Sequence, residues 1–215
     1  MTSFKSVVLD VDSTISALEG IDWLAERRDA DVAATVVALT NDAMDARVPL
    51  DEVYERRLRI IRPTRDEIAQ LASIYLATAL PGVRDAVVAW LRAGVRVVLV
   101  SGGLRDAILP LAAWLGVTAE DVYAVDVDYD DAGVVRGVDA EALLARRGGK
   151  PLLVASLALP RPVLAVGDGA TDAELVSVVD RFLAFTGVVR RESVVAKAAG
   201  EVADFASLTP IVLGA

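Results

Sequence analysis

The sequence predicts an α/β fold with a parallel sheet at its core and a block of helices inserted after the first strand. The strands are expected at four short apolar runs, residues 7–9, 95–100, 163–166 and 182–185. Helical patterns separate the later runs, whereas residues 16–78 show helical patterns only. Strands that alternate with helices are typical of a parallel sheet with helices on both faces, and such sheets bind ligands at the carboxyl ends of their strands.

The inserted block has apolar residues at helical spacing over its whole length. Its helices are expected at residues 17–28, 31–43, 51–61 and 64–78. Pro81-Gly82 then marks the return of the chain to the sheet. We therefore expect two units: a core formed by residues 1–15 and 79–215, and a helical lid formed by residues 16–78 over the strand ends.

The second half of the chain continues the alternation of strands and helices. Apolar spacing predicts helices at residues 107–115 and 140–147. Residues 123–138 alternate between apolar and polar side chains around Asp130-Asp131-Ala132-Gly133, which predicts a β-hairpin.

Composition restricts the chemistry that the chain can perform. The 215 residues include no cysteine and no histidine, which excludes thiolate and imidazole metal sites, a cysteine nucleophile and a Ser-His-Asp triad. Acid–base chemistry must then come from carboxylates, lysine, tyrosine or metal-bound water, and Mg²⁺ becomes the expected metal because it prefers oxygen ligands.

Charge and hydropathy indicate the partners and the location to expect. The formal net charge of −9 argues against non-specific binding to nucleic acid or to an anionic membrane. No apolar run is long enough to cross a bilayer, and the first residues lack the pattern of a signal peptide. We therefore expect a cytoplasmic protein, either a monomer or a homodimer.

Acidic residues follow two of the expected strands. Asp10 and Asp12 lie two positions apart after the first strand, where their mutual repulsion could be relieved by a divalent cation. Asp168 follows the third strand in Gly167-Asp168-Gly169-Ala170-Thr171-Asp172, and it could add another hard ligand while Asp172 orients metal-bound water. Each motif, taken singly, is also compatible with an ordinary polar turn.

Two further motifs are suited to phosphate. Ser101-Gly102-Gly103 follows the second strand and offers a hydroxyl and consecutive backbone N–H groups. Lys150, one of only three lysines, follows two glycines and could bring a positive charge to a phosphate. A turn and a solvated loop lysine are the alternatives for these two motifs alone, but four independent turns would rarely occur together in this order.

These four motifs together resemble those of the haloacid-dehalogenase-type (HAD) phosphatases, and specifically the phosphoserine phosphatase branch. Glu19-Gly20-Ile21-Asp22, Ala43-Met44 with Val48-Pro49, residues 55–58 and residues 182–190 add to the likeness, which covers nearly the whole chain. The resemblance implies a HAD-like Rossmannoid sheet with a C1-type helical cap. It also implies hydrolysis of O-phospho-L-serine, a step of serine biosynthesis, through an aspartyl-phosphate intermediate.

The resemblance also implies roles for individual residues. Asp10 is the expected nucleophile and Asp12 the acid and base. The carboxylates of Asp10 and Asp168 and the backbone carbonyl of Asp12 are expected to hold Mg²⁺, supported by Asp172. The residues expected to contact the phosphate or the substrate are Ser101, Gly102, Lys150 and Thr171.

The inserted block carries the expected specificity residues. On a helix over residues 51–61, Arg57 falls within an apolar face formed by Leu50, Val53, Tyr54, Leu58 and Ile61. A buried arginine is costly unless an anion meets it, although a snorkelling side chain is the alternative. The resemblance implies that Arg57 binds the substrate carboxylate and that Glu19, otherwise a helix-starting residue, binds the ammonium group. The alternative function is action on another small phosphate ester, with water or another hydroxyl as acceptor.

Overall fold

The computed structural model describes residues 3–44, 50–138 and 142–215 and confirms the α/β fold. A six-stranded parallel sheet has the order β3-β2-β1-β6-β7-β8. Its strands are β1 (Ser6–Leu9), β2 (Arg96–Leu104), β3 (Val122–Val125), β6 (Val163–Gly167), β7 (Arg181–Phe185) and β8 (Glu201–Val202). The apolar runs thus mark four of these strands, while β3 and β8 were not expected as members of the sheet.

Strand β1 lies in the middle of the sheet and fixes the register of its neighbours. Leu9 pairs with Leu99 of β2 on one side and with Val166 of β6 on the other. Because the three strands are parallel, the residues that follow them emerge at the same edge of the sheet. The acidic motifs and Ser101 are therefore brought together there by register alone.

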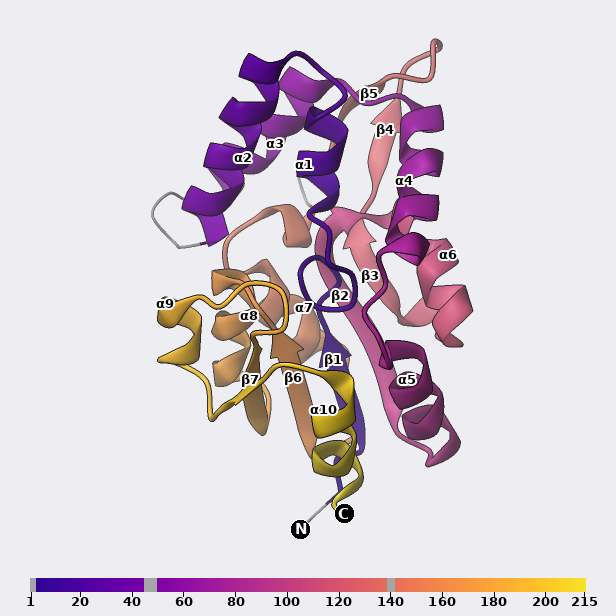
Figure 1. Cartoon of the computed structure of the whole chain (residues 1–215), viewed down its shortest axis with the longest axis vertical. Helices are drawn as coiled ribbons and strands as arrows, with labels where there is room; N and C mark the ends of the chain where they lie inside the picture. Colours follow the sequence, from indigo (N-terminus) through magenta and orange to yellow (C-terminus); the bar gives the residue numbers. More distant parts are fainter. Residues whose placement is uncertain (1–2, 45–49, 139–141) are drawn as a thin grey trace.

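The helices between β1 and the next core helix lie beyond this edge, in the upper half of Figure 1. They are α1 (Gly20–Ala25), α2 (Ala30–Met44), α3 (Leu50–Ile61) and α4 (Arg65–Ala77). Helix α4 begins with a capping box, in which the Thr64 hydroxyl accepts from the Glu67 N–H while the Glu67 carboxylate accepts from the Thr64 N–H. The four expected helical segments are confirmed, with shifts of a few residues at their ends.

The predicted hairpin is smaller than expected. Residues 122–125 are not part of it, because they pair with β2 as the edge strand β3. The hairpin consists of β4 (Val127–Tyr129) and β5 (Val135–Val138), and it packs on the junction between α3 and α4. There the Arg65 N–H donates to the Gly133 carbonyl and the Val135 N–H donates to the Pro63 carbonyl.

The remaining helices surround the sheet. They are α5 (Val83–Arg92), α6 (Arg105–Leu115), α7 (Gly149–Ser156), α8 (Ala170–Ala173), α9 (Glu192–Val195) and α10 (Phe205–Leu213). The helix expected at residues 107–115 is confirmed as α6. The helix expected at 140–147 is wrong over its described part, where only a short 3₁₀ turn, Leu143–Ala145, forms; residues 140 and 141 lie outside the described residues.

The core is continuous from the sheet into the inserted helices. Trp90 of α5 and Phe185 of β7 both pack against Phe205 of α10, at ring-centroid distances of 6.3 and 5.6 Å. Buried side chains of α3 and α4, including Leu58 and Ile68, belong to the same apolar cluster. None of the helices in the described part of the chain is long and apolar enough to span a bilayer.

Candidate active site

The first residue after β1, Asp10, is held by a lysine from a distant helix. Lys150 Nζ donates to Asp10 Oδ1 and to Asp172 Oδ1, each at 2.6 Å, and the three side chains are almost fully buried. Burial lowers the pKa of Lys150, but the charges of Asp10 and Asp172 outweigh this effect and raise it above its usual value. The lysine therefore stays charged.

Glycines make room for this cluster. Gly149, at the start of α7, packs so closely on the Leu143 carbonyl that an added Cβ atom would lie 1.6 Å from the carbonyl oxygen. A Cβ atom on Gly167 would lie 2.2 Å from Asp172 Cγ. A side chain at position 149 would displace either the backbone of Leu143 or the start of α7, which carries Lys150, and a side chain at position 167 would displace Asp172.

Three carboxylates at this edge are suited to a cation. Oxygens of Asp10, Asp168 and Asp172 all lie within 4.8 Å of one another. Burial raises the pKa of Asp168 to about 7, which the Arg191 guanidinium, 3.3 Å from Asp168 Oδ2, opposes. Burial, followed by the charge of Asp172, raises the pKa of Asp10 well above its usual range. Buried oxygen donors with surplus negative charge fit a hard divalent ion such as Mg²⁺.

Asp12 is fixed by the inserted helices rather than by the sheet. Its Oδ1 accepts from the Gly20 N–H at 2.8 Å and from the Tyr75 hydroxyl at 2.6 Å. Its Oδ2 lies 3.0 Å from the position that a Cβ atom on Gly103 would take. Burial raises the pKa of Asp12, and the two hydrogen bonds oppose that shift.

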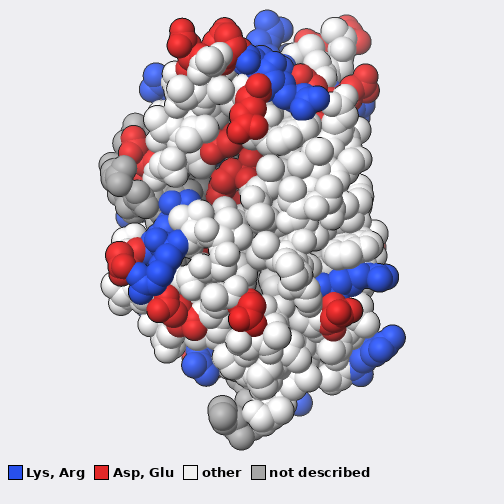
Figure 2. Space-filling view, viewed as in Figure 1, with Lys and Arg blue, Asp and Glu red and all other residues white. Residues whose placement is uncertain are grey.

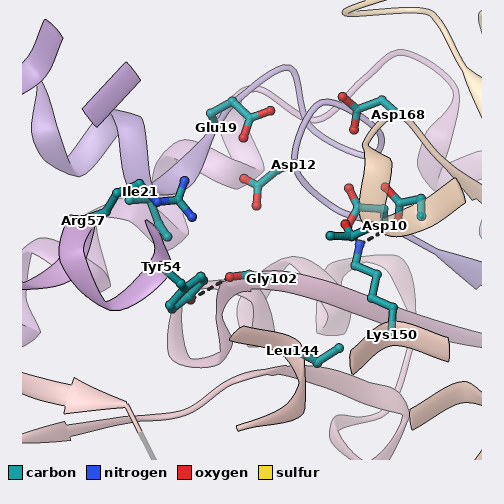
Figure 3. Close-up of a pocket in the computed structure, with 12 residues that line it drawn as sticks. Asp10, Asp12, Glu19, Ile21, Tyr54, Arg57, Gly102, Leu144, Lys150 and Asp168 are labelled. Carbon is teal, nitrogen blue, oxygen red and sulfur yellow. Dashed lines mark hydrogen bonds and ion pairs between the residues drawn. The ribbon is translucent and has the colours of Figure 1, made fainter. Parts of the chain in front are cut away.

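Ser101 and Gly102 lie within β2 instead of following it, because this strand extends to Leu104. The Ser101 hydroxyl accepts from the Gly103 N–H at 2.9 Å, while the Gly102 carbonyl accepts from the Tyr54 hydroxyl at 2.7 Å. The second bond joins α3 of the inserted block to the phosphate-type motif (Figure 3). Burial raises the pKa of Tyr54, so its hydroxyl remains a donor.

Arg57 lies on the buried face of α3, as the helical spacing predicts, and is 3% exposed. Its Nη1 donates to Thr40 Oγ1 at 2.8 Å, and the Thr40 hydroxyl donates to Asp22 Oδ1. Its buried Nε has no hydrogen-bond partner. The guanidinium reaches into the cavity (Figure 3). Val53, Tyr54, Leu58 and Ile61 are buried around it, and the side chain of Leu50 lies outside the described part.

Glu19 enters the same cavity from the residue before α1. The Ser13 hydroxyl donates to Glu19 Oε1 at 2.7 Å. Burial raises the pKa of Glu19 to about 8, and the neighbouring charges of Asp12 and Asp168 add to this shift. A cation at this position would therefore be attracted by several buried carboxylates. Figure 2 shows acidic side chains gathered in a hollow on the face of the molecule that Figure 1 also views.

One cavity, with about 520 Å³ of space that is partly open to solvent, unites most of the expected site residues. It is lined by Asp10, Asp12, Glu19, Arg57, Gly102, Lys150, Asp168, Thr171 and Asp172. Ser101 is buried next to it and does not line it. Ile21 and Leu144 add apolar walls.

The sequence interpretation missed Tyr54, Tyr75 and Arg191 as parts of this site. Tyr54 could have been found, because it lies three positions before Arg57 on the same helix face. Tyr75 has no such signal, since its place on the apolar face of α4 is that of an ordinary core residue. Lys150 lies in the first turn of α7 and is 5% exposed, so the alternative of a solvated loop lysine is wrong.

Comparison with known proteins places this geometry in a family. A model of the haloacid dehalogenase-like hydrolases matches residues 7–177. The chain belongs to this family. The haloacid dehalogenase-like match begins at β1 and extends through Asp168 and Asp172, so it includes all ten expected site residues.

Individual relatives agree with this assignment. Phosphoserine phosphatase of Rattus norvegicus is 33% identical over 96% of this chain and 92% of its own length. A phosphoserine phosphohydrolase-like protein from Francisella tularensis has a TM-score of 0.90 at 23% identity, over 97% of this chain and 100% of its own. A substrate-bound phosphoserine phosphatase complex has a TM-score of 0.82 at 20% identity, over 98% of both chains. The two structures share the fold of this chain along nearly its whole length.

Proposed function

We propose that this haloacid dehalogenase-like hydrolase is a phosphoserine phosphatase, which converts O-phospho-L-serine and water to L-serine and phosphate. One observation carries the proposal: a single cavity holds the carboxylate–lysine cluster of Asp10 and Lys150, together with Arg57 and Glu19. The first pair suits a phosphate ester, and the second pair suits the carboxylate and the ammonium group of an amino acid. The identity with phosphoserine phosphatases along the chain supports the same substrate.

In the proposed first step, an Asp10 carboxylate oxygen attacks phosphorus and forms an aspartyl phosphate while the ester P–O bond breaks. The attack brings a carboxylate toward a phosphate dianion, and Lys150 offsets part of this repulsion. The Ser101 hydroxyl, the Gly102 backbone and Thr171 bind the phosphate. Mg²⁺, held by Asp10, Asp168 and the Asp12 carbonyl with support from Asp172, would supply further charge neutralisation when bound.

Asp12 moves the protons of both steps. As an acid it gives its proton to the departing serine oxygen, which leaves as an alcohol. As a carboxylate it then takes a proton from the attacking water, whose oxygen displaces Asp10 from phosphorus and restores the free carboxylate. Its burial, and its place 3.0 Å from the Gly103 Cβ position, put it beside the phosphate motif.

Arg57 and Glu19 select the amino acid part of the substrate. The Arg57 guanidinium is fixed from one side through Thr40, and its unpartnered Nε leaves a donor for a carboxylate. Glu19 attracts the ammonium group. A substrate that lacks either charge leaves one of these buried groups uncompensated, which costs affinity.

Residues 16–78 form a cap domain in this proposal, and residues 1–15 with 79–215 form the core. The chain leaves and rejoins the core at one place, because the Ala17 N–H donates to the Thr78 carbonyl and the Leu80 N–H donates to the Ile15 carbonyl. Such paired connections suit a cap that closes over the substrate. A cytoplasmic location and a role in serine biosynthesis remain predictions from the sequence.

Phosphate release from L-phosphoserine, phosphoethanolamine and phosphoglycolate, with and without Mg²⁺, tests the proposal. We expect the highest kcat/KM for L-phosphoserine, a requirement for Mg²⁺, and loss of at least about a thousandfold in turnover for Asp10→Asn. Preference for another ester, or faster transfer to an alcohol than to water, would assign the alternative function. An active Asp10→Asn protein, with the Asn verified by mass spectrometry, would exclude this nucleophile.

A further inference from the structure

Asp12 is held by a side chain that the proposed mechanism does not use. Tyr75 projects from α4, and its hydroxyl donates a 2.6 Å hydrogen bond to Asp12 Oδ1. The residue is completely buried. A buried phenol that reaches out of the apolar face of a helix to a carboxylate needs a reason beyond core packing, since phenylalanine would fill the same space.

Gly20 makes this contact possible. Its N–H donates to the same Oδ1 at 2.8 Å, and a Cβ atom at position 20 would lie 2.1 Å from the Tyr75 hydroxyl oxygen. Only glycine therefore leaves the hydroxyl in its place. Two elements of the inserted block, α1 and α4, thus direct one donor each at a single oxygen of Asp12.

The other oxygen of Asp12 faces the phosphate motif. Oδ2 lies 3.0 Å from the Cβ position of Gly103, and Ser101 Oγ lies 3.1 Å from that same position. An oxygen that already accepts two hydrogen bonds has little remaining capacity for a covalent proton. A proton carried by Asp12 is therefore placed on Oδ2, on the side of Ser101.

We propose that Tyr75 is a positioning residue for proton transfer: its hydroxyl, with the Gly20 N–H, occupies Asp12 Oδ1 and directs the transferable proton to Oδ2. The inference rests on the proposed function, in which Asp12 protonates the leaving alcohol. Tyr75 touches no reacting atom. Tyr75 belongs to the inserted block. Asp12 is therefore correctly oriented only while α4 packs on the core.

Tyr75→Phe tests this role through its dependence on the leaving group. In single-turnover phosphoryl transfer, we expect the rate to fall about 10- to 100-fold with phosphoserine and phosphoethanolamine, whose alkoxide leaving groups need a proton. With p-nitrophenyl phosphate, whose leaving group needs none, we expect a loss of less than about threefold. Equal losses with alkyl and aryl phosphates, or no loss with either, would overturn the proposal.

Tyr129→Phe is the matched control. Tyr129 also donates its hydroxyl to a carboxylate, Asp106 Oδ2 at 3.1 Å, but it lies outside the cavity. Its loss should leave both rates unchanged, and circular dichroism should show that both variants are folded.

A double-mutant cycle gives a second readout. If Tyr75 acts through Asp12, adding Tyr75→Phe to Asp12→Asn should change the alkyl phosphate rate by less than about threefold, whereas multiplied losses would contradict the proposal. Failure of the phosphoserine assignment looks different, since the wild type would then fail on phosphoserine itself. If the wild type fails on phosphoserine, the role of Tyr75 can still be tested by comparing the rate losses of Tyr75→Phe with phosphoethanolamine and with p-nitrophenyl phosphate.

Discussion

Lys150 and Asp10 lie 140 positions apart in the sequence, yet Lys150 Nζ is 2.6 Å from Asp10 Oδ1. The same ammonium group is 2.6 Å from Asp172 Oδ1. One buried cation thus bonds two buried carboxylates that follow different strands, so the site and the stability of the fold depend on the same side chain.

Lys150→Met should destabilise the protein, because it leaves Asp10 and Asp172 buried without their counter-charge. We expect a loss of about 3–5 kcal/mol in the free energy of unfolding, measured by denaturant titration in the presence of chelator. The exposed Lys197, changed to Met, is the control and should cost less than about 0.5 kcal/mol. The double variant Lys150→Met/Asp172→Asn should recover part of the loss, and no recovery would show that the charges do not cause it.

Arg57→Ala should act on one substrate and not on another. Loss of a desolvated, charge-assisted contact to the substrate carboxylate should lower kcat/KM for phosphoserine. The lost transition-state stabilisation should be about 2–5 kcal/mol. Phosphoethanolamine has no carboxylate and should lose little. Arg57→Lys keeps the positive charge but loses the planar guanidinium, so its kcat/KM for phosphoserine should lie between those of the wild type and Arg57→Ala. Parallel losses with both substrates would make Arg57 a structural residue.

Glu19→Gln should show the complementary pattern. A bound ammonium group favours the ionised carboxylate of Glu19, and Gln cannot ionise, so kcat/KM for phosphoserine should fall while that for phosphoglycolate, which has no amine, should be spared. The ratio of the two kcat/KM values, wild type against variant, measures this selectivity. An unchanged ratio would separate Glu19 from recognition of the amine.

Glu67 at the start of α4 predicts a pH dependence of stability. The Arg28 hydrogen bonds hold the pKa of Glu67 at about 2, well below its ordinary value of 4.5. A lowered pKa in the folded state stabilises the protein above the unfolded value, and this stabilisation is lost as pH falls from about 4.5 toward about 2. Glu67→Gln should therefore lower stability by about 1 kcal/mol at pH 7, after allowance for solvent screening, and by nearly nothing near pH 2.

The exposed Glu55–Arg59 pair of α3 supplies the control for this comparison. Glu55→Gln should change stability by less than about 0.5 kcal/mol at either pH. Thermal unfolding curves of both variants across the acid range give the two differences directly. A Glu67→Gln effect that does not shrink at low pH would exclude the ion pair as its cause.

Gly149→Ala should both destabilise the protein and reduce activity. The new Cβ atom would meet the Leu143 carbonyl oxygen, a backbone atom, so either the Leu143 backbone or the start of α7, which carries Lys150, must move. We expect a loss of about 1–3 kcal/mol or more in the free energy of unfolding. Gly137→Ala is the matched control, because nothing lies within 4 Å of its Cβ position, and it should be close to neutral. Equal thermal stability of the two variants would contradict the packing argument.

The sequence predicts the strand-end part of the site because a parallel sheet leaves little freedom there. Once β1, β2 and β6 are adjacent, the residues after them must meet at one edge, whatever the loops do. Arg57 could be placed for a similar reason, since helical spacing alone puts it on the apolar face of α3.

Other features could not be read from local pattern. Gly148-Gly149 and Pro151 look like helix-breaking residues around Lys150, but Gly148 caps α7 with φ +73° and Pro151 lies in its first turn, where a missing N–H costs nothing. At residues 143–145 apolar spacing indicated an α-helix where only a 3₁₀ turn forms. The contact between Tyr75 and Asp12 joins residues 63 positions apart, and the apolar spacing of a helix or strand cannot predict a contact between such distant residues.

The central position of β1 sets the order in which a newly synthesised chain can acquire its structure. This strand leaves the ribosome before its two partners, which begin at Arg96 and Val163. The inserted helices follow β1 directly, and their contacts join segments that are close in sequence. They can therefore form before the partner strands of β1 have been synthesised. A nascent chain stopped before β6 carries Asp10 without Asp168 or Asp172. The reactive arrangement of these carboxylates can therefore form only after β6 and the residues that follow it have been synthesised.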